Sequence, residues 1–498
     1  MNILGISAGF HDAGVTLINN GDILFAGHAE RYSKIKHDKD LNSSILLDAI
    51  SYGNPTKIAY YERPWVKKSR QLYAGQYSDL TKDWTVAGML KRYASDLNLH
   101  KLPIKTYNHH LSHAAAGFQT SIFDEATVVV IDAIGEWDTI SIWHAEYNKN
   151  GHAEYKKLWG QKYPHSIGLM YSAFTKEAEL MPLDEEYILM GMSSYAKKHY
   201  FFRSWLMDSA TECRFKHNLH IGLPYDDTYK IYYHDLDKFD LAGGAQYLAE
   251  DLIHSIMFKA SRIGSSKNLV YMGGVALNCL ANRDIGKYFN NIWIMPNPGD
   301  AGSSLGAAAL LYKKQLNWTD AYLGHNITGA YPVTNLINEL QVNKIVGVAN
   351  GPAEFGPRAL GNRSLLADPR GPEIKDKVNN IKRRQKFRPF APVILEEYVD
   401  EYFLMPKGFS TSPYMQTVAK CLYPIEFPAI VHVDGTSRVQ TVSKNCRSGI
   451  RLLLEEWYKL TGCPMLLNTS LNIRGEPMVN NRADADRFEN LYNVKVFS

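Results

Sequence analysis

Three histidines lie within five residues in the stretch HHLSHAAAGF, at His109, His110 and His113. If a helix begins near His109, then His109 and His113 are four residues apart on one face, and His110 and His113, three apart, could also converge. Two imidazoles on one face form half of a metal site. A histidine pair alone is more often structural, so the metal interpretation depends on further ligands elsewhere in the chain.

Carboxylates suited to complete such a site follow two predicted strands. Asp132 ends the apolar run VVVID, and Asp300 lies in the tight turn NPGDAG. Two histidines and two aspartates with open positions would suit a divalent ion such as Fe, Mn or Zn. Such an ion could hold nucleotide phosphates and polarise a reacting carbonyl. We therefore predict a metal site formed by His109, His113, Asp132 and Asp300.

A histidine beside an aspartate stands in an earlier turn, GFHDAGVTL, at His11 and Asp12. At a cleft, such a pair can act as the general base on an acceptor hydroxyl. A turn-capping aspartate next to a surface histidine would give the same pattern. We predict His11 and Asp12 as catalytic residues.

Basic residues are concentrated between positions 358 and 388, where ten Lys and Arg face three Asp and Glu, a local charge of 10 − 3 = +7. An exposed, solvated face would explain this run, as would a site for phosphate-bearing ligands or nucleic acid. Asparagine and serine at strand ends further along can bond a small amide-like group. Together they resemble a pocket for a small phosphorylated amide more than a nucleic-acid groove, which spreads its basic residues more widely. The candidate pocket residues are Lys382, Arg383, Arg384, Lys386, Arg388, Arg438, Asn468, Thr469, Ser470 and Asn472.

Two related hairpin patterns suggest how these residues are positioned. NILGISAGFHDAGVTLINNGDILFAG and ATVVVIDAIGEWDTISIWHAE each alternate buried strands with turns that hold glycine and acidic residues. Two such hairpins fit a duplicated actin-like nucleotide-binding fold, in which each half offers a hairpin to the phosphates. The junction at Gly273 and Gly274 lets backbone approach a ligand closely, although glycine turns also serve packing alone.

Composition sets broad limits. The chain has 498 residues, 45% of them hydrophobic, with a net charge of +4. We divide it into residues 1–340 and 341–498, because a loop rich in glycine, proline and arginine follows position 345. The five cysteines show no CxxC spacing, which argues against a disulfide framework or zinc cluster. No apolar run long enough for a membrane span and no signal peptide is apparent, so we expect a cytoplasmic protein.

Six motifs occur together in a known order: HHLSHAAAGF, MGGVALNCLAN, FGPRALGNRSLLADPR, FRPFAP, HVDGTSRVQTV and LNTSLNIRGEPMV. In these motifs the chain resembles the O-carbamoyltransferases of the NodU/CmcH type over essentially its whole length. The resemblance implies α/β and α+β architecture, with a duplicated actin-like (ASKHA) domain followed by a YrdC-like domain. It also implies that carbamoyl phosphate and ATP, with Mg, form carbamoyl adenylate, whose carbamoyl group then passes to a hydroxyl acceptor.

The resemblance also assigns residues. It implies that the predicted metal is iron and that His11 and Asp12 lie at the acceptor end. The residues that it implies hold carbamoyl phosphate are Lys382, Arg388, Arg438, Asn468 and Ser470. It places Gly273, Gly274 and Asn278 at the nucleotide. One departure is Ile188, which occupies the position of a lysine in the family, so a cleft contact is lost or replaced.

Several alternatives remain open at the level of sequence. The acceptor could be a sugar, a nucleoside or another small metabolite, or a hydroxymethylated pyrimidine in DNA. A tRNA threonylcarbamoyl-modifying enzyme shares both domain types, and a non-catalytic nucleic-acid-binding protein would explain the basic run. We expect a small-molecule donor and acceptor, no membrane partner, and a homodimer as one possible assembly.

Overall fold

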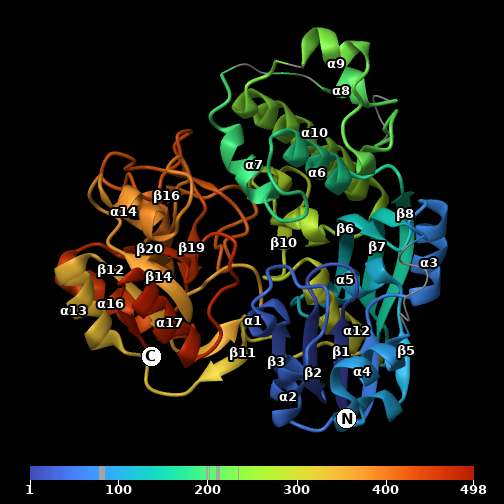
Figure 1. Cartoon of the computed structure of the whole chain (residues 1–498), viewed down its shortest axis with the longest axis horizontal. Helices are drawn as coiled ribbons and strands as arrows, with labels where there is room; N and C mark the ends of the chain where they lie inside the picture. The colour runs from blue at the N-terminus through green and yellow to red at the C-terminus, as the bar shows by residue number, and fades with distance from the viewer. Residues whose placement is uncertain (78–84, 198–199, 201, 209–212, 234) are drawn as a thin grey trace.

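A computed structural model of the chain describes residues 1–77, 85–197, 200, 202–208, 213–233 and 235–498. Two five-stranded sheets form most of the N-terminal part, and a six-stranded sheet forms the centre of the C-terminal part (Figure 1). Helices cover all three sheets, which confirms the predicted mixed α/β class.

The first sheet places the hairpin turn of His11 and Asp12 at one edge of its central strand. Its strand order is β3 (Asp22–His28), β2 (Gly14–Asn19), β1 (Asn2–Ser7), β4 (Lys57–Tyr60) and β5 (Ile104–Thr106). β1, β2 and β3 pair antiparallel, whereas β4 runs parallel to β1 and β5 parallel to β4. β1 is buried along nearly its whole length, as expected for a central strand covered on both faces.

The second sheet repeats this arrangement. Its order is β8 (Ala153–Lys162), β7 (Asp138–Tyr147), β6 (Glu125–Gly135), β9 (Asn268–Met272) and β10 (Asn291–Trp293). Again the first three strands in sequence pair antiparallel and the last two add in parallel. The two sheets therefore have the same strand order and directions, which is the duplication expected from the two hairpin patterns.

Helices α5 (His109–Phe118) and α12 (Ser303–Tyr312) pack against each other between the two sheets. Both are rich in alanine and glycine along their shared surface, so their backbones come very close. A Cβ atom on Gly306 would lie 1.8 Å from the carbonyl oxygen of Ser112, so glycine is required there. This close packing fixes the start of α5 next to the start of α12.

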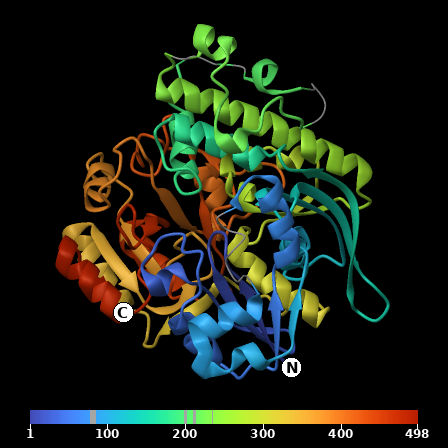
Figure 2. The same ribbon diagram turned by 45° about the vertical axis from the view of Figure 1, so that its right-hand side comes forward.

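The remaining helices of the N-terminal part cover the outer faces of the sheets. α6 (Ile167–Glu177), α7 (Glu186–Ser193) and α10 (Lys238–Ile263) bury the outer face of the second sheet, and α10 runs across the top of the molecule in both views (Figures 1 and 2). The other helices are α1 (Glu30–Ser33), α2 (Ser43–Ser51), α3 (Pro64–Tyr73), α4 (Val86–Ala94), α8 (Arg203–Leu206), α9 (Asp227–Tyr232) and α11 (Cys279–Asn282).

The C-terminal sheet is mixed. Its order is β19 (Gln440–Val442), β15 (Ala391–Leu395), β20 (Met465–Ser470), β14 (Arg363–Ala367), β12 (Ile345–Ala349) and β21 (Val496–Phe497). Helices α13 (Val333–Asn343) and α16 (Ile450–Thr461) share one apolar cluster with the sheet, and α14 (Ile374–Ile381) and α17 (Arg482–Tyr492) share another. The smaller elements are β11 (Tyr322–Ile327), β13 (Gly351–Glu354), β16 (Phe403–Leu404), β17 (Ala419–Cys421), β18 (Thr436–Ser437) and α15 (Val399–Tyr402).

The predicted division near residue 340 stays a prediction; α13, which contains that residue, packs on the C-terminal sheet. All five cysteines are free, in agreement with the sequence. None of the helices formed by the described residues combines the length and the apolar character needed to span a bilayer.

Candidate active site: a histidine–aspartate cluster and an arginine pocket

The predicted histidine pair lies on the first two turns of α5, which begins at His109, as the sequence analysis supposed. Asn108 caps this helix, because its side chain accepts a hydrogen bond from the amide of Leu111 at 3.0 Å. The Nε2 atoms of His109 and His113 lie 3.1 Å apart, and both side chains are buried. The side chain of His110 contacts Ser141 instead of this pair, with its Nδ1 atom 2.7 Å from the Ser141 hydroxyl oxygen.

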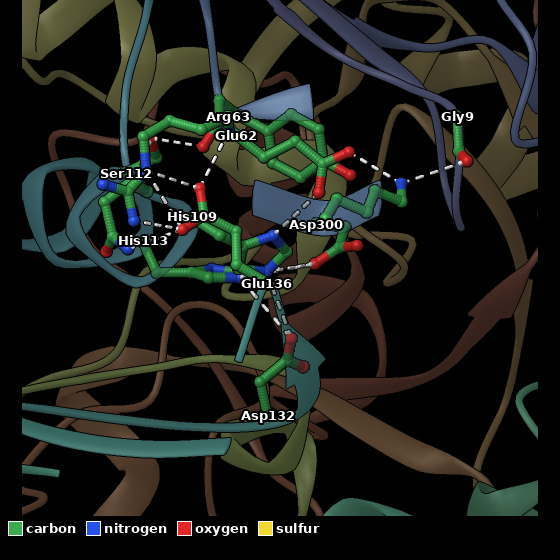
Figure 3. A network of polar contacts seen from close by, with 12 residues as sticks. Gly9, Glu62, Arg63, His109, Ser112, His113, Asp132, Glu136 and Asp300 are labelled. Carbon is green, nitrogen blue, oxygen red and sulfur yellow. Dashed lines mark hydrogen bonds and ion pairs between the residues drawn. The ribbon is translucent and has the colours of Figure 1, made fainter. Parts of the chain in front are cut away.

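The predicted carboxylates converge on the same two imidazoles. Asp132 near the end of β6 and Asp300 at the turn before α12 each lie 3.3 Å from His109 Nε2, and Asp300 lies at the same distance from His113 Nε2. One ligand atom from each of the four residues lies within 4.8 Å of every other (Figure 3). The structure therefore brings all four predicted metal-site residues together.

The charges of this group balance one another. Burial alone would lower the pKa of His109, but Asp300, Asp132 and Glu62 outweigh it and raise that pKa well above its usual value. Burial would likewise raise the pKa of Asp132, yet the imidazoles hold it below its usual value. Two buried carboxylates beside two imidazole nitrogens form a donor set that fits a divalent first-row metal ion. That they bind one stays a prediction.

Glu62 is a further member that the sequence analysis missed. Its carboxylate lies 3.7 Å from His109 Nδ1 and accepts a hydrogen bond from Lys67 Nζ at 2.6 Å, and both side chains are buried. A carboxylate at this place orients the imidazole of a metal ligand. Glu62 follows the apolar strand KIAYY, as Asp132 ends an apolar run, so the same strand-end pattern could have identified it.

The glycine pair positions Asp132. The amide of Gly274 donates to Asp132 Oδ1 at 3.1 Å. Gly273 has φ +91°, and a Cβ atom there would lie 2.1 Å from the carbonyl oxygen of Ile131, so only glycine is accommodated. Asn278, predicted beside them at the nucleotide, exchanges side-chain hydrogen bonds with Gln246 at 3.0 and 3.1 Å.

The second predicted site, at His11 and Asp12, includes another histidine. Asp12 accepts hydrogen bonds from His11 Nδ1 at 2.9 Å and from His37 Nδ1 at 2.8 Å, and the two rings are stacked. His11 Nε2 lies 2.6 Å from the carbonyl oxygen of Leu183. Burial lowers the pKa of His11, but Asp12 outweighs it and raises that pKa to about 9. The raised pKa of His11 favours the protonated ring, whose Nε2 donates to Leu183, so His11 can act as a base only after it loses this proton.

Four arginines of the C-terminal part, Arg358, Arg384, Arg388 and Arg438, form a cluster of like charges that lower one another's pKa, here called the arginine pocket. Burial and the charge of Arg438 lower the pKa of Arg358 to about 9, and burial with the neighbouring arginines lowers the pKa of Arg384. Arg438 Nε is buried without a hydrogen-bond partner. Within the described residues, no carboxylate forms an ion pair with any of the four. Half-buried like charges of this kind fit an anionic ligand with several oxygens.

The structure places the other predicted pocket residues in a hydrogen-bonded group. Lys382 Nζ donates to the carbonyl oxygen of Ser470 at 2.5 Å, to its hydroxyl at 3.2 Å, and to two oxygens of Asn472 at 2.8 and 2.9 Å. Asn468 Nδ2 donates to Gln440 Oε1 at 2.7 Å, while its Oδ1 is buried without a partner. Arg384 belongs to the wider set of candidate residues but not to the five that the resemblance assigns, and Arg358 was not predicted as a pocket residue, although it lies in a stretch quoted above for the resemblance.

Ile188, the departure noted in the sequence, lies on α7 and is fully buried in the apolar cluster on the second sheet. It points into the core, and the polar contacts of this region come instead from the residues just before it: Leu183, Asp184, Glu185 and Tyr187.

Comparisons with known proteins agree with this arrangement. A family model described as "Carbamoyltransferase N-terminus" matches residues 2–309, and one described as "Carbamoyltransferase C-terminus" matches residues 337–497. The chain is 32% identical to an uncharacterized protein of Synechocystis, over 98% of this chain and 94% of that protein. It is 29% identical to Nodulation protein NolNO of Sinorhizobium fredii, over 95% of this chain and 76% of that protein.

Nodulation protein U of Sinorhizobium fredii matches over a shorter stretch, with 35% identity over 47% of this chain and 46% of that protein. Among solved structures, HypF of T. kodakarensis is 12% identical over 62% of this chain and 47% of its own, with a TM-score of 0.38. This score is too low for a detailed comparison of the folds.

Proposed function

The chain belongs to the carbamoyltransferase family and is an enzyme that transfers a carbamoyl group, and we propose that it does so in two steps at separate sites. At the arginine pocket, carbamoyl phosphate gives its phosphate to water, and an oxygen of the resulting carbamate attacks the α-phosphorus of ATP, releasing pyrophosphate. At the histidine–aspartate cluster, an acceptor hydroxyl attacks the carbamoyl carbon of the adenylate and AMP leaves.

The observation that carries this proposal is the arginine pocket itself. Four half-buried guanidinium groups without a carboxylate counter-charge favour a ligand that brings several negative charges. Carbamoyl phosphate and the triphosphate of ATP both do so, and arginine binds such oxygens with two parallel hydrogen bonds. The same cations stabilise the charge that develops on the leaving pyrophosphate. Lys382, Asn468 and Ser470 would orient the carbamoyl amide.

The histidine–aspartate cluster supports the second step. His109, His113, Asp132 and Asp300 would hold a divalent ion, for which iron is our proposal, and a bound ion would supply Lewis-acid stabilisation of the oxyanion formed on the carbamoyl group. Glu62, whose carboxylate lies 3.7 Å from His109 Nδ1, would orient the ring by charge. Asp12 holds His11 and His37 beyond the end of β1, where His11, after losing the Nε2 proton that it donates to Leu183, would take the proton of the acceptor hydroxyl.

Several finer points belong to the same proposal. We assign residues 1–340 to an actin-like transfer unit and residues 341–498 to a YrdC-like unit, with Mg bound to ATP and the glycine pair and Asn278 near the nucleotide. We propose a small hydroxyl-bearing acceptor, with a hydroxymethylated pyrimidine in DNA as the second candidate. A homodimer is the proposed assembly.

The test is incubation of the protein with ATP, Mg, carbamoyl phosphate and a panel of hydroxyl acceptors. Pyrophosphate release that depends on carbamoyl phosphate, together with a carbamoyl mass gain on one acceptor, is the expected result. The panel contains amino sugars, nucleosides and DNA with hydroxymethylcytosine, and a DNA acceptor should also bind with a steep salt dependence. Absence of pyrophosphate release in the presence of both donor substrates would rule the two-step reaction out.

A further inference from the structure

Residues 183–187 connect the C-terminal part with the group formed by His11, Asp12 and His37, here called the Asp12 site. The carbonyl oxygen of Leu183 accepts from His11 Nε2, and Asp184 bonds to His37 Nε2 at 3.0 Å and to Lys36 Nζ. The next residue, Glu185, turns the other way and pairs with Arg474 of the C-terminal part at 2.6 Å. Within this short segment, contacts therefore pass from the Asp12 site to the C-terminal unit.

Tyr187 is the residue in this segment that touches a cation of each site. Its ring centroid lies 5.4 Å from Lys36 Nζ, which is tied to the Asp12 site through Asp184. The same ring lies 4.7 Å from Arg388 Cζ, a member of the arginine pocket. Both distances are within the range of cation–π attraction. The ring, which is half-buried, thus lies between Lys36 of the Asp12 site and Arg388 of the arginine pocket.

The chemistry of a phenol suits this position better than that of a carboxylate. An aromatic face attracts Arg388 without neutralising it, so its charge remains available to an anion, whereas Lys36 is already paired with Asp184. An aspartate or glutamate at the same place would form an ion pair with Arg388 and repel a phosphate. A bulky neutral ring also excludes water, which would otherwise hydrolyse an acyl adenylate.

We propose that Tyr187 is a positioning residue between the Asp12 site and the arginine pocket, where its ring retains the carbamoyl adenylate and shields it from water until an acceptor arrives. This inference rests on the two-step reaction proposed above. The neighbouring residue Ile188 anchors α7 in the core, which leaves Tyr187 to contact Lys36.

The test needs no acceptor. The wild-type protein is mixed with ATP, Mg and carbamoyl phosphate, and the burst of pyrophosphate and the later steady release of AMP are measured separately. Each leaked adenylate reacts with one water to give AMP and carbamate. In Tyr187→Ala we expect the ratio of steady AMP release to burst amplitude to rise at least about five-fold, whereas Tyr187→Phe, which keeps the ring, stays at the wild-type ratio.

Tyr195 provides the matched control. Its hydroxyl donates to the carbonyl oxygen of Phe387 at 3.0 Å, so it packs against the same stretch of the C-terminal part as Tyr187. Tyr195→Ala should leave the AMP leak unchanged. An equal leak in Tyr195→Ala and Tyr187→Ala would overturn the proposal, because it would reflect a loosened interface. An unchanged leak in Tyr187→Ala with a normal burst would overturn it as well.

A second variant keeps the inference testable if Tyr187→Ala does not fold. Lys36→Met removes the other partner of the ring without touching the arginine pocket, and it should raise the AMP leak in the same way. If Lys36→Met released AMP at the same rate, relative to the pyrophosphate burst, as the wild-type protein, the proposal would be contradicted. A wild-type protein that gives no pyrophosphate burst at all would instead contradict the two-step reaction, so the two failures are distinguishable.

Discussion

The histidine–aspartate cluster and the arginine pocket differ in charge balance: opposite charges are paired in the cluster, whereas like charges lie together in the pocket. In the cluster, carboxylates and bases alternate: Asp132, Asp300 and Glu62 meet His109, His113 and Lys67. In the pocket, like charges face one another, and burial and mutual repulsion lower the pKa of Arg358 and Arg384. A balanced site keeps its shape by itself, whereas a site of like charges gains stability when an anion enters it.

The largest expected effect breaks the cluster alone. His113→Ala removes one of the paired imidazoles, so carbamoyl transfer to the acceptor should fall by about 10²- to 10³-fold. Pyrophosphate release should stay within about two-fold of wild type, since the arginine pocket is untouched. Both steps are measured in one reaction, with His144→Ala, a histidine bonded to Ser265, as control. An equal fall in both steps would mean that the sites are not separate.

The converse change breaks the pocket alone. Arg438→Ala removes a charge-assisted contact with phosphate, worth about 1.5 to 3 kcal/mol, so pyrophosphate release should fall by about 10- to 150-fold. Metal content, measured by elemental analysis, should remain at the wild-type level. Arg447→Ala is the matched control, because Arg447 is an exposed arginine already paired with Asp320. A loss of metal in Arg438→Ala would show that the two regions are coupled.

A milder change tests the outer contact of the cluster. Glu62→Gln keeps the size of the side chain but removes the charge facing His109 Nδ1, so affinity for Mn²⁺ should fall by about 10- to 100-fold. Competition with a chelator measures this dissociation constant. Unchanged affinity would make Glu62 a packing residue. Replacing Glu136, which pairs with Arg63 nearby, by Gln should leave the affinity unaltered.

The Asp12 site predicts a dependence on pH. The pKa of His11 is raised to about 9 and that of His37 to about 10, against burial, by Asp12 and, for His37, Asp184. Their stabilising effect is complete below the ordinary histidine pKa of about 6.5 and is lost as pH rises through 9 to 10. Wild-type protein should thus lose about 1 to 2 kcal/mol of unfolding free energy between pH 7 and 10, and Asp12→Asn much less. Urea unfolding at both pH values checks this. An equal loss of unfolding free energy in the wild-type protein and in Asp12→Asn would contradict it.

The smallest effect sharpens the contrast between the regions. Arg358→Gln removes one of the mutually repelling cations, so the free energy of unfolding without ligand should rise by about 1 kcal/mol. The additional stability conferred by pyrophosphate should decrease in the same variant. Urea unfolding with and without pyrophosphate measures both. A less stable ligand-free variant would mean that Arg358 has structural partners that outweigh the repulsion.

The sequence predicted the cluster better than the pocket, and the reason is local geometry. The spacing of His109 and His113 fixes both on one face of a helix, and strand-end positions point Asp132 and Asp300 to one edge of their sheets. The pocket arginines come from loops such as FGPRALG and FRPF, where spacing does not determine direction. Arg358 and Arg384 could therefore not be separated in advance from neighbouring basic residues that remain in solvent.

By itself, the amino-acid sequence determined the α5 histidine pair, the strands that carry the carboxylates and the glycines that permit close backbone approach, because each depends on neighbours a few positions away. Only the tertiary structure decided that Glu62 stands behind His109, that His11 is held by Leu183, and that Tyr187 faces a cation of each site. Those contacts join elements far apart in the chain, and their geometry is set by how the sheets and helices pack.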